Sequence, residues 1–169
     1  MQTVVVGASG FIGSHLVDGL LTAGYRVKAL SRHLPGLISS AAQAHPALSL
    51  QPLSMADGLA LQQALEGVDL VFHLASGSLP QSSNRDPQAD VEANLLGGLK
   101  LLEAARHAQV RRLVMVSSGG TVYGVPQQVP IPETHPTEPT CSYGITKLAI
   151  EKYVALYRQL YGLDGLVLR

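Results

Sequence analysis

The sequence predicts an α/β protein with an open, mostly parallel β-sheet and helices on both faces. Three observations support this class. A short β-branched run, Val4 to Val6, leads through a glycine-rich turn directly into a helical pattern. Strand-like and helical segments then alternate along the chain, as they do when crossover helices join parallel strands. Residues 68–75 (VDLVFHLA) form a nearly continuous apolar run, which is typical of a central parallel strand covered on both faces.

Length and composition indicate one globular domain. The 169 residues are 46% hydrophobic and 14% charged, and 12 Lys and Arg balance 12 Asp and Glu. Such a chain buries a core without disulfides, and it has no charge excess to attract nucleic acid or an anionic membrane. Its one cysteine, Cys141, fits a reducing compartment, and no apolar run approaches the roughly 20 residues of a membrane span. We therefore expect a cytoplasmic protein without a signal peptide, membrane segment or metal site.

A glycine-rich turn after the first strand is the strongest candidate for a ligand site. Gly7, Gly10 and Gly13 stand at three-residue intervals between the strand and the first helix. Gly7 permits a tight turn, Gly10 leaves space for a phosphate, and Gly13 lets the helix lie close to the strand. Together with the unpaired N–H groups of a helix N-terminus, such a turn binds a pyrophosphate. The alternative is a turn that binds no ligand.

The first half of the chain continues with helices and strands in alternation. The helix after the glycines is expected to bury one apolar face, made of Ile12, Leu16, Leu20 and Leu21. Gly24 should end it. The elements expected next are a strand over 25–30, an irregular connection over 33–46, a strand over 48–53, a helix capped by Asp57 and closed by Gly67, the strand over 68–75 and a polar loop over 79–87.

The end of the second expected strand bears on the choice of dinucleotide. Folds that bind NAD usually place an acid there for the adenosine ribose, whereas an arginine suits the 2′-phosphate of NADP. This chain has Ser31 and Arg32 at that point. A hydroxyl and a guanidinium can hold a phosphate, and no carboxylate is present to repel it. The sequence therefore favours NADP over NAD, with a solvated surface arginine as the alternative.

Two long helices dominate the second half of the chain. The first is expected over 88–109, with Asn94 inside a stripe of apolar residues, namely Val91, Leu95, Leu99, Leu102 and Ala105. A polar side chain in that setting needs a partner, so Asn94 either bonds neighbouring backbone and fixes the adjoining loop, which we favour, or is exposed. The other expected elements are a strand over 111–116, a proline-rich loop over 125–140, a helix over 142–161 ended by Gly162, and a strand over 166–169.

Hydroxyl, phenol and ammonium groups fall where ligands bind in open α/β sheets. Ser118 and Thr121 follow the strand over 111–116, beyond its carboxyl end. Tyr143 and Lys147 are four residues apart in the last helix, which puts them on one face, one turn apart. A nearby cation favours the phenolate and lowers the pKa of the tyrosine, which can then act as a general base. This spacing is common on ordinary helices, and only its place after a dinucleotide turn favours the catalytic interpretation.

These motifs occur together in one known family. GASGFIG at 7–13, HLA at 73–75, Asn94, SSGGTVYG at 117–124, YGITK at 143–147 and VLR at 167–169 resemble the extended short-chain dehydrogenase/reductases. Within that group the chain is most similar to the NAD-dependent epimerase/dehydratases of nucleotide sugars, of the UDP-glucose 4-epimerase kind. The resemblance covers essentially the whole chain. It implies that residues 1–169 form an NAD(P)-binding Rossmann domain with strand order 3-2-1-4-5-6.

The resemblance also implies a mechanism and a set of cofactor contacts. The tyrosine that matches Tyr143 takes the proton from a sugar hydroxyl while the nicotinamide accepts a hydride from the same carbon, and the lysine that matches Lys147 bonds the nicotinamide ribose. The catalytic residues implied are Tyr143, Lys147, Ser118 and Thr121. The cofactor-binding residues implied are Gly7, Gly10, Phe11, Ile12, Gly13, Ser31, Arg32, Ser54, Met55, Leu74, Ala75, Ser76, Asn94, Ser117, Tyr143 and Lys147.

Three features depart from the family pattern. Gly119 occupies the position of the usual catalytic Ser or Thr, which leaves Ser118 or Thr121 to bond the reacting oxygen. Ser54 occupies the position of the acid that contacts adenine. The chain is also much shorter than members of the family and stops where their substrate-binding lobe begins. We therefore expect that lobe to be absent and turnover to be impaired.

Three functions remain open on the sequence. The first is the NAD(P)-binding domain of a nucleotide-sugar epimerase or dehydratase. The second is a non-catalytic dinucleotide-binding or dimerisation module, because in the family the helices that match 88–109 and 142–161 commonly pair in a homodimer. The apolar surface expected for that contact is Leu102, Tyr153, Leu156 and Tyr157. The third is an NADP-dependent reductase of a small carbonyl compound, which Ser31 and Arg32 would suit.

Overall fold

Six strands form one sheet in the order β3-β2-β1-β4-β5-β6, and every adjacent pair is parallel. The computed structural model describes residues 1–169. The strands are β1 (Gln2–Val6), β2 (Arg26–Ser31), β3 (Leu48–Pro52), β4 (Leu70–His73), β5 (Arg112–Val116) and β6 (Asp164–Leu168). The observed strand order confirms the predicted Rossmann-type sheet.

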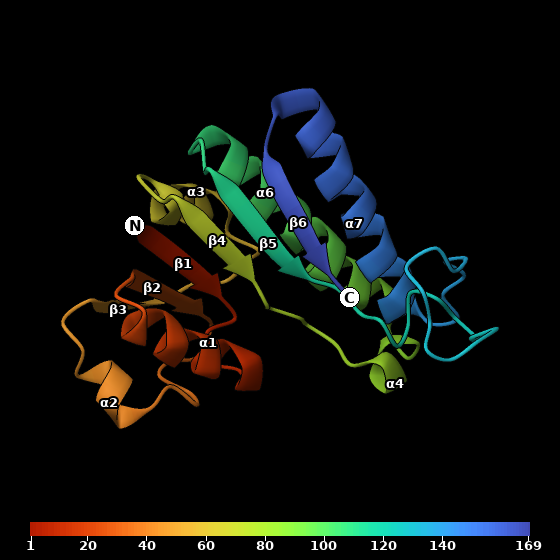
Figure 1. The fold of residues 1–169 in the computed structure, drawn as a ribbon, viewed down its shortest axis with the longest axis horizontal. Coiled ribbons are helices and arrows are strands. Elements are labelled where there is room, and N and C mark those ends of the chain that lie inside the picture. Colours follow the sequence, from red (N-terminus) through yellow and green to blue (C-terminus); the bar gives the residue numbers. More distant parts are fainter.

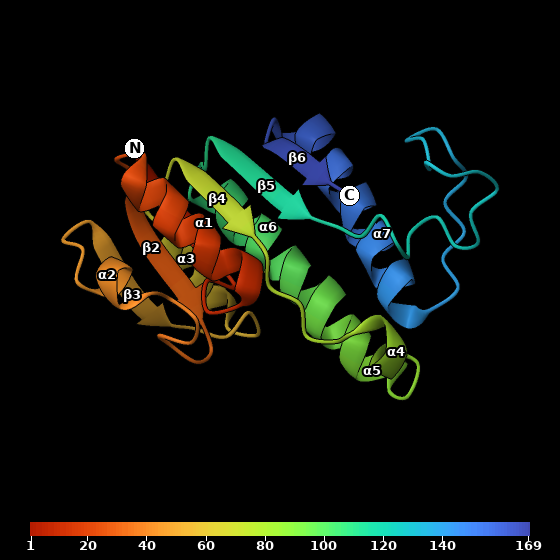
Figure 2. The ribbon, with the colours of Figure 1, turned by 60° about the horizontal axis from the view of Figure 1, so that its bottom comes forward.

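Helices cover both faces of the sheet, also as predicted. Those of the first half are α1 (Phe11–Thr22), α2 (Ser40–Gln43) and α3 (Gly58–Leu65). Those of the second half are α4 (Pro80–Ser83), α5 (Pro87–Asp90), the π-helical segment η1 (Val91–Leu96), α6 (Gly97–His107) and α7 (Ser142–Tyr161). Figure 1 shows α1 on one side of the sheet and α6 and α7 on the other. The loop between β5 and α7 extends beyond the carboxyl ends of the strands (Figure 2).

The core has two parts, one on each face of the sheet. The larger cluster has 19 buried residues and joins the strands to α3, α6 and α7, whereas the smaller cluster of 9 lies beneath α1 and α2. In β4, Val71 and His73 are buried, but Leu70 and Phe72 are only half-buried. β4 is a central strand as predicted, and Phe72 packs against the smaller cluster, but the face of β4 on the α1 side (Figure 1) is covered less completely than the face that carries Val71 and His73.

Three predicted elements differ in detail from the structure. The helix expected over 88–109 is continuous from Pro87 to His107, but its middle widens into the π-helical segment η1. The loop expected over 79–87 contains the short helix α4. The last strand, expected over 166–169, begins earlier, at Asp164. Asp164 pairs with Arg112 of β5 through the backbone, and the side chains of these two residues form an ion pair of 2.6 Å. None of the helices combines the length and apolar character needed to cross a membrane.

Two apolar side chains lie on other faces than predicted. Ile12 is 57% exposed, because it stands in the first turn of α1, whose buried side begins at Gly13 and Ser14. Leu102 is 2% exposed and packs in the larger core cluster. It therefore cannot contribute to an apolar surface for a second subunit, as we had expected.

Candidate functional site

A cleft of about 740 Å³ opens at the carboxyl ends of the strands, where β1 lies between β2 and β4. This is the point at which the strand order reverses, and open α/β sheets bind their ligands there. Ten of the predicted cofactor-binding residues line the cleft: Gly7, Gly10, Phe11, Ser31, Arg32, Ser54, Met55, Leu74, Ala75 and Ser76. The cleft is thus formed by several stretches of chain that are separate in the sequence, between residues 6 and 97.

Each glycine of the turn is needed for a different structural reason. Gly7 has φ of +87°, and a Cβ on it would lie 2.6 Å from the backbone nitrogen of Ala75. A Cβ on Gly13 would collide with the carbonyl oxygen of Gly7. A Cβ on Gly10 would meet nothing closer than 3.4 Å within the protein. Gly7 and Gly13 are therefore required by packing, and Gly10 keeps the mouth of the cleft open.

The N-terminus of α1 offers unpaired donors at this mouth. The N–H groups of Phe11, Ile12 and Gly13 form no hydrogen bond within the protein, and Gly10 precedes them without a side-chain cap. Unpaired amides and the positive end of the helix dipole together attract an anion. The exposed Ile12 thus enters the site through its backbone. The residues present fit the diphosphate of a dinucleotide.

The wall formed by β2 carries the residues predicted to distinguish the two dinucleotides. Ser31 is buried, and its hydroxyl accepts a hydrogen bond of 3.2 Å from the Ser9 N–H. Arg32 is exposed and forms no ion pair. Among the lining residues the only carboxylate is Glu92, which belongs to η1. Ser9, His33 and Glu92 were not predicted, although Ser9 lies within the glycine motif itself.

The opposite wall is held by Asn94. Its side-chain oxygen accepts hydrogen bonds from the Gly77 N–H at 2.8 Å and from the Ser76 hydroxyl at 3.3 Å. Asn94 is buried in η1, so it fixes the segment that follows β4 against the long helix. This confirms the prediction that Asn94 bonds neighbouring backbone and fixes the adjoining loop.

Tyr143 and Lys147 share one face of α7, as predicted, but their electrostatics differ from the prediction. The Lys147 Nζ lies 5.6 Å from the centre of the tyrosine ring and donates a hydrogen bond of 3.1 Å to the Val116 carbonyl. Burial raises the pKa of Tyr143 above its ordinary value, and the neighbouring Ser76 side chain only partly opposes this. Burial also lowers the pKa of Lys147. The expected lowering of the tyrosine pKa was therefore wrong for the chain alone, because burial outweighs the hydrogen bond with Ser76, and the charge that acts on the phenol from Asp90 also raises its pKa.

The hydroxyls beyond β5 divide into two groups. Thr121 donates a hydrogen bond of 2.8 Å to the Ser118 hydroxyl, so these two candidates lie together. The buried Ser117 donates its hydroxyl to Glu151 instead, and Arg169 bonds the same carboxylate. The structure thus keeps Ser118 and Thr121 as a pair and turns Ser117 away from the cleft.

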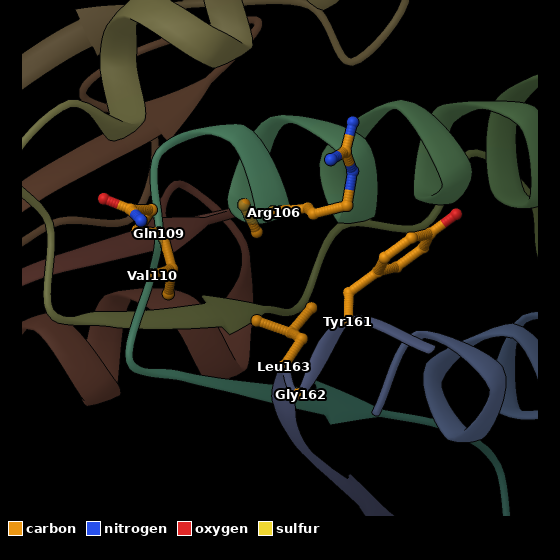
Figure 3. A pocket seen from close by; sticks show the side chains of 7 residues that line it. Arg106, Gln109, Val110, Tyr161, Gly162 and Leu163 are labelled. Atoms are coloured by element: carbon orange, nitrogen blue, oxygen red, sulfur yellow. The ribbon is translucent and has the colours of Figure 1, made fainter. Parts of the chain in front are cut away.

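A second hollow, of about 400 Å³, lies at the other edge of the sheet. It is lined by the C-terminal ends of α6 and α7 and by the residues that lead into β5 and β6 (Figure 3). The Arg106 guanidinium stands 5.0 Å from the centre of the Tyr161 ring at its rim. No predicted site residue lies there, so the cleft at the carboxyl edge is the candidate site.

Comparison with known proteins agrees with this geometry. The sequence model of the NAD dependent epimerase/dehydratase family matches residues 3–169. The chain belongs to the NAD-dependent epimerase/dehydratase family. Its fold, its glycine turn and its family membership were all predicted from the sequence.

Curated and solved relatives carry names from within the family. UDP-glucose 4-epimerase of Mycolicibacterium smegmatis is 39% identical over 170 residues, which cover 97% of this chain and 53% of that protein. The crystal structure of Thermus thermophilus UDP-glucose 4-epimerase in complex with NAD superposes with a TM-score of 0.90 at 37% identity, covering 100% of this chain and 54% of the other. The Thermotoga maritima enzyme with UDP-glucose gives 0.90 at 34% identity, covering 100% and 55%. The chain thus spans about half the length of these epimerase/dehydratase relatives.

Proposed function

We propose that residues 1–169 act as the NAD(P)-binding domain of a nucleotide-sugar epimerase or dehydratase. The observation that carries this proposal is the open cleft under unpaired α1 amides, with the Tyr143 phenol beside its Ser76 wall. A dinucleotide bound there supplies hydride transfer at a sugar carbon. The nucleotide-sugar substrate is proposed by analogy with the relatives, which are named as UDP-sugar 4-epimerases.

Each candidate catalytic residue has a distinct proposed role. Tyr143 accepts the proton of the reacting hydroxyl at its phenol oxygen, with Lys147 orienting the ribose beside it. The Ser118 and Thr121 pair, already bonded to each other, donates to the reacting oxygen in place of the side chain that Gly119 lacks. Because burial raises the pKa of Tyr143, its base form must be favoured by what binds beside it. The rate of the proposed reaction should therefore depend on pH through the ionisation of the Tyr143 phenol.

The proposal is tested by calorimetric titration of the chain with NAD and with NADP. Binding of either one supports it, and the absence of heat with both at millimolar concentration overturns it. Epimerisation of UDP-glucose, measured with NAD or NADP present, separates an active enzyme from a non-catalytic dinucleotide-binding module. Tyr143→Phe should abolish turnover and leave cofactor affinity unchanged, since only the hydroxyl is lost and the aromatic ring remains in place.

We propose further that NADP binds more tightly than NAD. Arg32 is exposed on the cleft wall without an acidic partner, and Ser31 lies next to it. Arg32→Ala should weaken NADP binding about tenfold, because a hydrogen bond to a charged group contributes about 1.5–3 kcal/mol, and should leave NAD binding nearly unchanged. Equal losses for both cofactors, or a wild-type preference for NAD, would contradict this part of the proposal.

We also propose that the domain forms a homodimer through the outer face of α6 and α7. On α7, three apolar side chains remain exposed, with fractions of 37% for Tyr153, 40% for Leu156 and 57% for Leu160. An apolar stripe on a helix face that packs against nothing in its own chain suits an isologous contact with a second copy.

A further inference from the structure

Asp90 is a buried carboxylate with no role in the functions proposed above. It stands at the end of α5 and is 2% exposed, yet no cation forms an ion pair with it. An unpaired buried charge is costly unless hydrogen bonds replace the lost water. The side chain must therefore be explained by its hydrogen-bond partners.

Those partners come from both sides of the site. On the cofactor side, one carboxylate oxygen accepts from the Asn94 amide at 2.7 Å and from the Ser78 hydroxyl. On the other side, the second oxygen accepts from the Ser142 hydroxyl at 2.8 Å and the Thr146 hydroxyl at 3.0 Å. Burial alone would raise the pKa of the carboxyl, but these four donors outweigh it and lower the pKa of Asp90. The residue is therefore an anion that joins two elements.

The two elements are the wall of the cleft and the helix of the catalytic pair. Asn94, which bonds Asp90, also holds Ser76 and Gly77 on the cleft wall. Ser142 and Thr146 belong to the first two turns of α7, and the peptide between them carries Tyr143. One side chain thus ties the cofactor cleft to the tyrosine.

The start of α7 depends on such outside contacts, because its own N-cap residue contributes none. Cys141 makes no capping hydrogen bond. Instead, the Ser142 N–H donates to the Asn84 side chain at 2.8 Å, and the Tyr143 N–H donates to the Ser83 hydroxyl at 3.1 Å. Free N–H groups at a helix start normally find a local cap. Here the cap of α7 comes instead from the side chains of Ser83 and Asn84, which lie more than fifty residues earlier in the chain.

We propose that Asp90 is a positioning residue that holds the first turn of α7, and with it the Tyr143 phenol, in place against the cofactor cleft. The inference rests on the role proposed for Tyr143. Asp90 acts through Ser142 and Thr146 on one side and Asn94 on the other, and it does not touch the reacting atoms. Its negative charge also acts on the catalytic pair, since it adds to the raised pKa of Tyr143 and partly opposes the lowering of the pKa of Lys147 by burial.

The test compares Asp90→Asn with Asp86→Asn in the 169-residue chain. Asparagine keeps the size of the side chain but offers an N–H₂ where an oxygen accepted hydrogen bonds. Asp86 is a matched control, because it only caps α5, by accepting from the Ala89 N–H at 3.0 Å, and asparagine caps equally well. Two readouts need neither cofactor nor substrate: hydrogen exchange along α7, and NMR titration of ¹³C-labelled tyrosine, in which Tyr143→Phe assigns the signal.

In Asp90→Asn, exchange at the first turn of α7 should rise about tenfold relative to the second half of the helix, since hydrogen bonds to a charged group are lost. The Tyr143 titration should move to lower pH, because a nearby negative charge has gone. Asp86→Asn should change neither readout. Equal acceleration across α7 and the sheet, with the Tyr143 titration unmoved, would mean that Asp90 only stabilises the fold and would overturn the proposal.

A second variant covers the case in which Asp90→Asn does not fold. Ser142→Ala combined with Thr146→Val removes the two donors on α7 and leaves the carboxylate in place. Faster exchange confined to the first turn supports the proposal, whereas exchange unchanged or uniformly faster overturns it. If the chain binds no dinucleotide, the proposed function fails, but these readouts still report whether Asp90 holds the turn.

Discussion

Gly7 is the residue of the cleft that tolerates least change. Its φ of +87° and the 2.6 Å approach of the Ala75 nitrogen both exclude a side chain. Gly7→Ala should therefore destabilise the fold by about 3 kcal/mol, from backbone strain and overpacking together. The measurement is the midpoint of urea unfolding.

The control for this prediction is another glycine. Gly19 lies inside α1, and a Cβ there would meet nothing within 4 Å. Gly19→Ala should stabilise the chain by about 0.5–1 kcal/mol, because alanine loses less backbone entropy in a helix. Similar effects of the two substitutions would show that the tight contact around Gly7 is absent in solution.

His73 is a second residue whose surroundings decide its behaviour. It ends β4, is buried, and its Nδ1 has no hydrogen-bond partner. Burial lowers the pKa of His73 from 6.5 to about 3, and the positive charge of Lys147 adds to this. The folded protein therefore holds a neutral imidazole that the unfolded chain protonates readily.

This difference predicts a loss of stability in weak acid. As pH falls below 6.5, the unfolded chain binds a proton that the folded chain does not take up until about pH 3. The free energy of unfolding should drop by about 2 kcal/mol between pH 6.5 and pH 5 through this group alone. His73→Leu should remove that part of the pH dependence in urea unfolding. His33→Gln, at an exposed position, should leave it unchanged.

At the scale of elements, the helix starts are held in two different ways. α3 has a local cap, since the Asp57 carboxylate accepts from the Ala60 N–H at 2.9 Å. α7 is capped by side chains that are distant in sequence, from the α4 region. A local cap is visible in the sequence as an acid before a helical pattern, and a distant cap is not.

The local cap gives a simple prediction for α3. Asp57→Ala should destabilise the fold by about 1 kcal/mol, whereas Asp57→Asn should cost only a few tenths, because asparagine retains an acceptor oxygen. Thermal unfolding of the two variants measures the difference. An equal loss in both would mean that the charge of Asp57, and not its hydrogen bond, stabilises the helix start.

At the scale of the whole molecule, the proposed dimer depends on the exposed apolar face of α7. Leu156→Lys should shift the chain from dimer to monomer in sedimentation velocity, because a charge would be buried at the contact. Leu59→Lys is the control, since that side chain is 67% exposed on α3. A wild-type chain that sediments as a monomer, or a variant that remains dimeric, would contradict the proposed contact.

Much of the site followed from short sequence signals. The glycine spacing, the strand before it and the amphipathic helix after it predicted a ligand site at this turn, and the family resemblance implied a set of residues of which ten line the cleft. Other residues carried no such signal. Asp90 looked like one more polar residue at the start of a helix, although it stands four positions before Asn94 and so on the same helix face. That four-residue spacing was the only signal in the sequence for the contact between Asp90 and Asn94.

The sequence by itself determined the α/β class, the glycine turn, the helix caps at Asp57 and Gly162, and the placing of Tyr143 and Lys147 on one face of α7. These depend on residues within a turn or two of each other, so local periodicity suffices to predict them. Only the tertiary structure decided that Leu102 is core, that Ser117 faces Glu151, that burial raises the pKa of Tyr143, and that Asp90 joins the cleft to α7. Burial and contacts between distant segments arise from packing, which no local pattern contains.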